Sequence, residues 1–214
     1  MSTVLFIKSH PLDEHSSISV AVGRAFLQAY RETHPQDEVV ELDLYQEWIP
    51  QMDRDVLQGR ARLLSGAALD ELNEQEQQKL SRLDQLVDQF IAADKYVFVS
   101  PMWNFSYPPQ LKAYIDAIFV AGKTFKYTEQ RPIGLLANTG RKAVHVQSSG
   151  GYYLSGRPMA QPEAGHYHLK LVLQFFGIEQ VDGIFIEGIG VHRDRVEELK
   201  QEAIARAVRL ASGY

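Results

Sequence analysis

The sequence of 214 residues contains no cysteine. Disulfide bonds, thiolate metal sites and cysteine nucleophiles are therefore excluded together. A long basic run is also missing and the formal net charge is -5, which argues against nucleic acid as a partner. No apolar stretch approaches the roughly 18 residues that a membrane-spanning helix needs, and the apolar run at 3–7 is too short for a signal peptide. We expect a cytoplasmic protein without a membrane span.

What the chain does contain is ordinary for a globular protein, with 45% hydrophobic and 23% charged residues. Short apolar runs predict five strands, at 4–7, 39–44, 96–100, 143–147 and 181–187. Apolar residues at helical spacing predict helices between and after them, at 18–34, 80–91, 110–121, 171–176 and 196–210. This alternation is typical of an α/β fold, a doubly wound five-stranded parallel sheet with helices on both faces. We expect one domain that spans residues 1–214.

Several segments fit this pattern less directly. Residues 45–75 form a connection longer than usual, with a short helix at 56–64, and this insertion could act as a lid, a subunit contact or a plain surface excursion. The alternation at 122–128 predicts a short edge or flap strand, and residues 152–161 are predicted to form a loop. The acidic run at 71–76 is interpreted as a solvated helix face.

The first loop with informative chemistry follows the first strand. It runs from Ser9 to Ser17, and Ser16 or Ser17 is a natural helix N-cap. Free N–H groups and the helix dipole at such a start favour a phosphate group, and serine hydroxyls would add donors. The loop contains no Lys or Arg, so a phosphate would be held by neutral donors. A simple serine cap would explain the same residues.

The second loop, residues 101–109, connects the third predicted strand to a helix. Ligands bind at the carboxyl ends of strands in open α/β sheets. Trp103 and Phe105 flank Asn104, an unusual composition for a solvated turn. The two aromatic rings could cover a planar ligand whose polar edge meets the amide. Aromatic packing in the core is the competing interpretation.

The third loop, residues 148–151, has the sequence Ser-Ser-Gly-Gly after the fourth predicted strand. Glycine lets the backbone approach a ligand closely, although an ordinary turn has the same composition. Together the three loops suit a mononucleotide with a broad tricyclic ring, FMN. In residues 134–142 the two glycines are one position too far apart for a P-loop, and Arg141 stands where its lysine should be. His166 and His168 would not share a helix face, so we predict no metal site there.

The segment 101–116, followed by 122–127, 132–136 and 148–151, resembles the FMN-dependent NADH azoreductases, also called FMN-dependent NADH:quinone oxidoreductases. The resemblance covers essentially the whole chain, and the motif at 101–105 is its most specific part. It implies a flavodoxin-like fold and a homodimer in which FMN is bound non-covalently near the interface.

The resemblance also implies roles for individual residues. The implied cofactor-binding residues are Ser9, His10, Ser16, Ser17, Ile18, Met102, Trp103, Asn104, Phe105, Ser148, Ser149, Gly150 and Gly151. Those at 16–18 would bind the phosphate, and those at 102–105 and 148–151 the isoalloxazine ring. The family often has serine where this chain has His10, and a hydroxyl where it has Ile18. Tyr127 and Tyr153, with residues of the partner subunit, are predicted to line the substrate pocket.

The implied reaction is a two-step, ping-pong electron transfer. NADH or NADPH would pass a hydride to N5 of the flavin and leave, and a quinone or azo compound would then take the same place and accept the electrons. Because the cofactor carries this chemistry, no acid–base catalyst is assigned. An electron carrier without nicotinamide oxidation and a non-catalytic interaction domain remain alternatives. The 45–75 insertion and the aromatic rim argue against a simple carrier.

Overall fold

A computed structural model describes residues 1–154 and 163–214, so residues 155–161 of the predicted loop lie outside the described residues. The central sheet contains β1 (Thr3–Lys8), β2 (Glu38–Asp43), β3 (Lys95–Pro101), β6 (Lys142–Ser148) and β7 (Gln180–Ile186). Their order is β2-β1-β3-β6-β7, and every neighbouring pair is parallel. The predicted doubly wound, five-stranded sheet is therefore confirmed.

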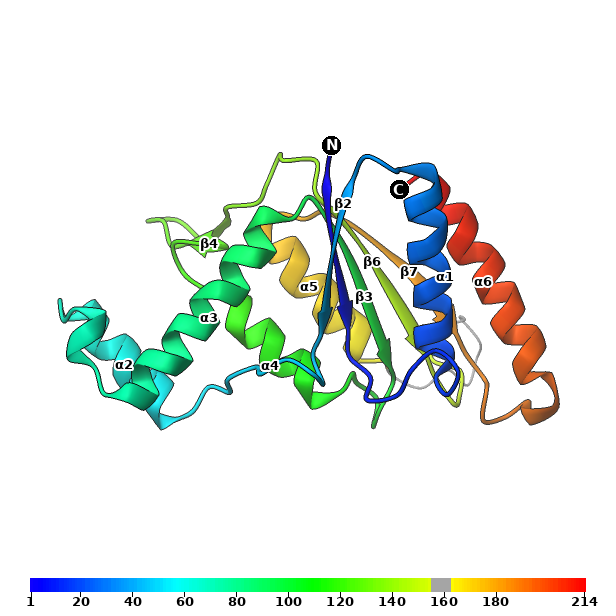
Figure 1. Cartoon of the computed structure of the whole chain (residues 1–214), viewed down its shortest axis with the longest axis horizontal. Coiled ribbons are helices and arrows are strands. Elements are labelled where there is room, and N and C mark those ends of the chain that lie inside the picture. Colours follow the sequence, from blue (N-terminus) through cyan, green and yellow to red (C-terminus); the bar gives the residue numbers. More distant parts are fainter. Residues whose placement is uncertain (155–162) are drawn as a thin grey trace.

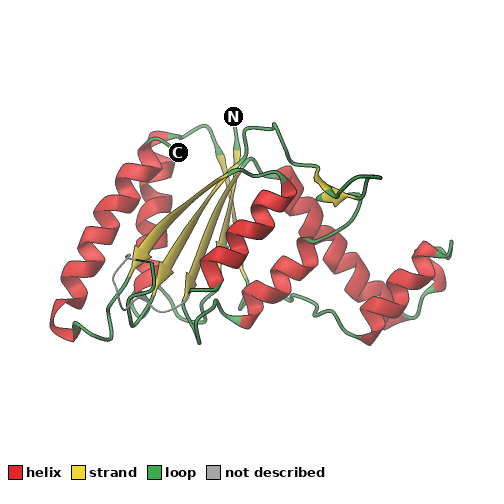
Figure 2. Cartoon of the chain, turned by 180° about the vertical axis from the view of Figure 1, so that it is seen from behind, coloured by secondary structure: helices red, strands yellow, loops and turns green. Residues whose placement is uncertain are grey.

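Helices cover both faces of this sheet (Figures 1 and 2). One face carries α1 (Ile18–Thr33) and α6 (Val196–Ser212), and the other carries α3 (Glu74–Ala92), α4 (Pro109–Ile118) and α5 (Gly165–Phe176). A short 3-10 helix, Arg193–Arg195, precedes α6. In the described ranges, no helix combines the length and apolar character that crossing a membrane requires.

Each central strand contributes to two separate cores. In β1, Leu5 and Ile7 face the core under α3, α4 and α5, whereas Val4 and Phe6 face the core under α1 and α6. All four side chains are at most 1% exposed. Burial on both faces explains why the strand is a continuous apolar run instead of an alternating one.

The amino edge of the sheet is closed by a network around Tyr214. The Tyr214 hydroxyl donates to the carbonyl oxygens of Tyr96 at 2.9 Å and Lys142 at 3.0 Å. Lys95 Nζ donates to the Tyr214 carbonyl at 2.9 Å and to the Tyr30 hydroxyl at 2.7 Å. Tyr30 in turn donates to Asp37 at 2.5 Å. Every polar group named here therefore has a partner.

The 45–75 connection contains α2 (Arg54–Leu64) and the 3-10 helix η1 (Leu69–Glu71). In Figure 1, α2 projects from the sheet and lies beside the start of α3. The predicted solvated face at 71–76 is wrong for Glu76, which is 3% exposed. Its carboxylate accepts the Asn73 N–H at 3.0 Å in a capping box and pairs with Arg62 of α2 at 3.0 Å. An acidic residue in the first turn of a helix can cap that turn instead of facing solvent.

The predicted strand at 122–128 is shorter than expected. Only β4 (Phe125–Lys126) forms, and it pairs antiparallel with β5 (Ile133–Gly134). This flap lies toward the amino edge of the sheet, where the Leu136 N–H donates to the carbonyl of Phe176 at the end of α5 at 2.9 Å. It is thus remote from the carboxyl ends of the strands.

Candidate functional site

The structure brings the three predicted loops together at the carboxyl edge of the sheet. The loops follow β1, β3 and β6, which are adjacent strands. The Ser9 N–H donates to the Val99 carbonyl at 2.8 Å, and the Met102 N–H donates to the Ser148 carbonyl at 2.7 Å. Backbone pairing thus continues past the strand ends and holds the three loops side by side.

The first loop ends at the N-terminus of α1, which Ser17 caps. Its hydroxyl accepts the Val20 N–H at 3.4 Å and lies 3.2 Å from the hydroxyl of Ser19. The N–H groups of Ile18 and Ser19 have no acceptor among the described residues. These free donors at a helix start form an anion-binding position. Ser16 is exposed, and its N–H donates to Asp13.

Ser19 lies beside the predicted phosphate position but was not among the predicted site residues. It is fully buried, and its hydroxyl meets that of Ser17 in the first helical turn. In sequence, Ser19 could have been found from its position two residues after the N-cap Ser17, in the first turn of the helix.

Ser9 is the most informative residue of the first loop. It is 0% exposed, and its Oγ has no hydrogen-bond partner among the described residues. Gln110 Oε1 and Tyr114 Oη, both on α4, share this property. A buried hydroxyl without a partner costs about 1–3 kcal/mol, so the Ser9 position is explained if a ligand completes it. Neutral hydroxyl and amide groups would bind such a ligand. The nearest lysine, Lys8, is already paired with Asp43 at 2.8 Å.

His10 connects the first loop to the second. Its Nδ1 accepts the Leu12 N–H at 3.0 Å, and its ring centroid lies 6.1 Å from that of Trp103. Burial lowers the pKa of His10 below its usual range, and the nearby Lys8 lowers it further. His10 is therefore neutral at pH 7, with its proton on Nε2, and presents one N–H donor.

The second loop contains a strained two-residue turn. The Trp103 N–H donates to the Ser106 carbonyl at 2.7 Å and the Ser106 N–H donates to the Trp103 carbonyl at 3.0 Å. Between them, Asn104 and Phe105 both have positive φ, at 50° and 69°. The left-handed region costs a non-glycine residue of the order of 1–3 kcal/mol, and such strain collects at functional sites. Trp103 and Phe105 are 39% and 52% exposed, so packing of these rings in the core is wrong.

The third loop leaves open space at Gly150. Ser148 and Ser149 are buried, whereas a Cβ placed on Gly150 would meet nothing within 4 Å. The Tyr153 ring lies 3.2 Å from the position of a Cβ on Gly151, and its centroid is 6.1 Å from that of Phe105. Tyr153 therefore lies between the second and third loops, and its role in a substrate pocket stays a prediction.

Tyr127 is not brought to this edge. It follows β4 and is 73% exposed, and its ring packs against that of Phe125. His166 and His168 also have different partners. His166 Nδ1 lies 3.3 Å from His145 Nδ1, whereas His168 Nδ1 lies 2.5 Å from the Tyr107 hydroxyl. In the part of the chain that the structure describes, no group of three His, Cys, Asp or Glu side chains could hold a metal ion.

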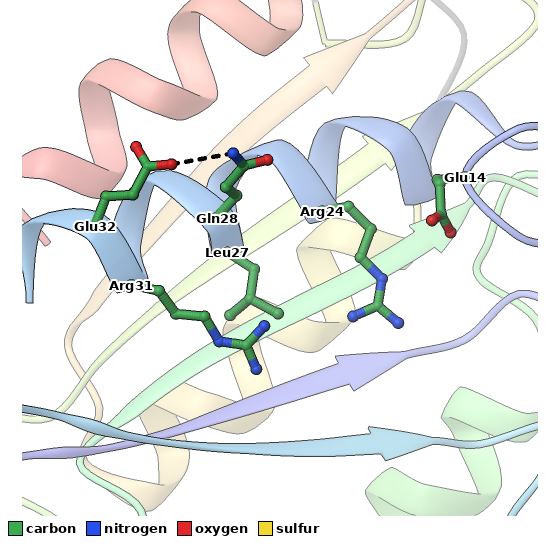
Figure 3. Close-up of a pocket in the computed structure, with 6 residues that line it drawn as sticks. All are labelled: Glu14, Arg24, Leu27, Gln28, Arg31 and Glu32. Atoms are coloured by element: carbon green, nitrogen blue, oxygen red, sulfur yellow. Dashed lines mark hydrogen bonds between the residues drawn. The ribbon is translucent and has the colours of Figure 1, made fainter. Parts of the chain in front are cut away.

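A separate hollow of about 480 Å³ lies along α1 (Figure 3). It is lined by Glu14, Arg24, Leu27, Gln28, Arg31 and Glu32. Both arginines pair with Glu41 of β2, and Glu14 and Glu32 add further negative charge. The charges of both arginines are therefore already balanced, and the residues that line the hollow include no aromatic ring, so we place the ligand site at the three loops.

Comparison with known proteins gives a consistent result. Residues 2–210 match the model of a family described as having a flavodoxin-like fold. The chain is 54% identical to FMN-dependent NADH:quinone oxidoreductase 2 of Bacillus licheniformis and 53% identical to the FMN-dependent NADH:quinone oxidoreductase of Geobacillus kaustophilus, with full coverage of both proteins in each case. Among solved structures, an azoreductase from Bacillus anthracis matches with a TM-score of 0.90 at 36% identity over the full length of both chains. An FMN-dependent NADH-azoreductase from the same species, in complex with FMN, matches with a TM-score of 0.88 at 34% identity, covering 99% of this chain and 100% of that one.

Proposed function

We propose a function that starts from family membership, because the chain belongs to the flavodoxin-like family that contains the FMN-dependent NADH:quinone oxidoreductases. The chain is an FMN-dependent oxidoreductase that passes electrons from NADH to quinones. The observation that carries this function is the convergence of a helix N-terminus, the buried unpaired hydroxyl of Ser9 and a strained aromatic turn at one edge. When bound there, FMN supplies the two-electron chemistry that amino-acid side chains lack.

The N-terminus of α1 would hold the phosphate group. The Ser17 and Ser19 hydroxyls and the free N–H groups of Ile18 and Ser19 provide neutral donors at the positive end of the helix dipole. Lys8, at the end of β1, is already paired with Asp43, so the phosphate would be held by these neutral donors. Ser9 Oγ would gain the partner that it lacks.

The other two loops would hold the planar ring. Trp103 and Phe105 present aromatic surface, Asn104 presents its amide, and the space beside Gly150 admits the ring close to the backbone. His10 would donate its Nε2 proton in a hydrogen bond without transferring it. These side chains orient the ring and exclude water from it, and none of them is assigned a proton-transfer step.

Finer features extend this proposal. The reaction follows a ping-pong order, in which the nicotinamide and the acceptor occupy the same place in turn. The similarity to azoreductases supports azo compounds as further acceptors and leaves NADPH as an alternative donor. Exposed apolar residues on α5, Tyr167 at 68% and Leu171 at 53%, support a homodimer with FMN near the interface. A cytoplasmic location completes the proposal.

The test begins with the absorbance of the purified protein. The account requires flavin absorbance, at the latest after reconstitution with FMN, and bleaching on anaerobic mixing with NADH. A protein that binds no flavin would end the proposal, and one that stays oxidised would be an electron carrier. Gly150→Val should weaken FMN binding by about tenfold or more, because its side chain enters the open space. Gly213→Val, also in open space but at the end of α6, is the matched control.

A further inference from the structure

Glu187 lies immediately after β7, the edge strand next to β6. One of its carboxylate oxygens, Oε1, accepts the N–H of Tyr153 at 2.5 Å and the N–H of Leu154 at 2.7 Å. Hydrogen bonds to an ionised acceptor are about twice as strong as neutral ones, so these contacts fix the backbone at 153–154. The predicted site residues did not include Glu187.

Backbone hydrogen bonds join the loop after β6 to the segment after β7, but they stop before residue 153. The Ser149 N–H donates to the Ile186 carbonyl at 2.8 Å. Gly188 and Gly190 then donate to the carbonyl oxygens of Gly151 and Gly150, at 2.9 and 3.0 Å. No backbone acceptor among the described residues serves the N–H groups of Tyr153 and Leu154. The carboxylate of Glu187 accepts both of these N–H groups in place of a backbone carbonyl.

The consequence reaches the site through the ring of Tyr153. That ring crosses the Phe105 ring at 78° with a centroid distance of 6.1 Å, an edge-to-face contact. Phe105 is itself held in its left-handed turn. Two rings from two different loops thus form one aromatic wall beside Gly151, and the carboxylate of Glu187 holds the backbone of its Tyr153 half.

We propose that Glu187 is a positioning residue that sets the acceptor preference of the enzyme by fixing Tyr153 against Phe105. This inference rests on the proposed function, because it assigns the aromatic wall to the acceptor side of the flavin site. Glu187 itself touches backbone N–H groups and does not take part in electron transfer. Its removal would loosen the wall while the phosphate position at α1 stays intact.

The experiment compares acceptors of different width on FMN-loaded enzyme with saturating NADH. A one-ring benzoquinone depends on contact with the wall, whereas a three-ring anthraquinone extends beyond it. For Glu187→Gln we expect the KM of benzoquinone to rise about fivefold relative to that of anthraquinone, with kcat changed less than about twofold. Glu179→Gln, which alters an exposed glutamate just before the same strand, should leave the KM ratio unchanged.

A double-mutant cycle separates positioning from a general loss of structure. If Glu187 acts through Tyr153, Tyr153→Ala should change the KM ratio in the same direction, and adding Glu187→Gln to it should have no further effect. Additive effects in the double variant, or an unchanged ratio in Glu187→Gln, would overturn the inference. If Glu187→Gln does not fold, Glu187→Asp keeps the charge on a shorter side chain and should give the same shift in the ratio. A wild-type protein without NADH-dependent quinone reduction would instead refute the proposed function.

Discussion

The two edges of the sheet are built in opposite ways. At the amino edge, Tyr214, Lys95 and Asp37 belong to a network in which each polar group has a partner. At the carboxyl edge, Ser9 has a buried hydroxyl without a partner and Phe105 has a positive φ. Both edges are formed by the same strands, so the difference does not come from the sheet.

The amino edge contributes mainly to stability, whereas the carboxyl edge keeps features that suit ligand binding. Satisfied hydrogen bonds and buried rings lower the free energy of the folded state. Strain and unsatisfied donors raise it, and they persist where a ligand uses them. We therefore expect substitutions at the amino edge to change the free energy of unfolding without changing cofactor binding. Substitutions of the strained or unpaired residues at the carboxyl edge should raise the stability of the apoprotein and weaken its function.

The largest expected effect is at the amino edge. Tyr214→Ala should lower the free energy of unfolding by about 3–5 kcal/mol, because it removes a ring that is 3% exposed and packs edge-on against Phe26 at 5.2 Å. Urea unfolding of the apoprotein measures this change. The FMN affinity of the folded variant should match that of the wild type. Tyr214→Phe keeps the ring and should cost only about 1 kcal/mol.

The pH dependence of stability tests the buried histidine close to the carboxyl edge. His145 is fully buried, with its Nε2 2.9 Å from the Ser100 hydroxyl and its Nδ1 3.3 Å from that of His166. Burial lowers the pKa of His145 well below its usual range, and the neighbouring His166 lowers it further. The unfolded chain therefore binds a proton that the folded chain excludes, so stability falls as the pH drops below about 6.5.

Below about pH 6 the free energy of unfolding should fall by up to about 1.4 kcal/mol per pH unit for one such proton, measured by urea unfolding between about pH 7.5 and pH 5. His145→Gln should reduce this slope by the contribution of one proton, whatever its effect at neutral pH, because burial also lowers the pKa values of His10, His166 and His168. A variant that keeps the wild-type slope would show that other groups take up the protons.

Relief of backbone strain should separate stability from function. Phe105→Gly removes a side chain from a residue with φ of 69° and should stabilise the apoprotein by about 1 kcal/mol. The same change removes half of the aromatic wall, so NADH-dependent quinone reduction should fall. Thermal unfolding and steady-state kinetics on one preparation measure both. Loss of stability and of activity together would mean that the turn is not strained.

The fold was predictable because its signals are local. Burial of β1 and β3 on both faces produces the continuous apolar runs, and helical spacing marks α3 and α6. The capping role of Glu76 was missed, since an acidic residue that begins a helix and one on a solvated face look alike in sequence.

The site was predictable only in part. Residues of the three loops that follow β1, β3 and β6 do meet, since parallel strands end at the same edge. The contribution of Glu187 depends on a contact between residues 33 or 34 positions apart, which no spacing rule contains. Tyr127 was assigned by resemblance, and within one chain it lies by the flap. Its place in the substrate pocket stays a prediction.

The most direct test of the account compares two buried serines. Ser9 and Ser100 are both 0% exposed, but Ser9 Oγ has no partner among the described residues, whereas Ser100 Oγ lies 2.9 Å from His145 Nε2. The measurement is the free energy of unfolding of the apoprotein together with the FMN dissociation constant for Ser9→Ala and Ser100→Ala.

The account predicts opposite signs for Ser9→Ala. The apoprotein should become more stable by about 1 kcal/mol, because an unsatisfied hydroxyl is removed, while FMN binding weakens about fivefold to tenfold. Ser100→Ala should lose stability because it leaves the buried Nε2 of His145 without its partner. An apoprotein destabilised by Ser9→Ala, with unchanged FMN binding, would contradict the claim that the carboxyl edge is left incomplete for the cofactor.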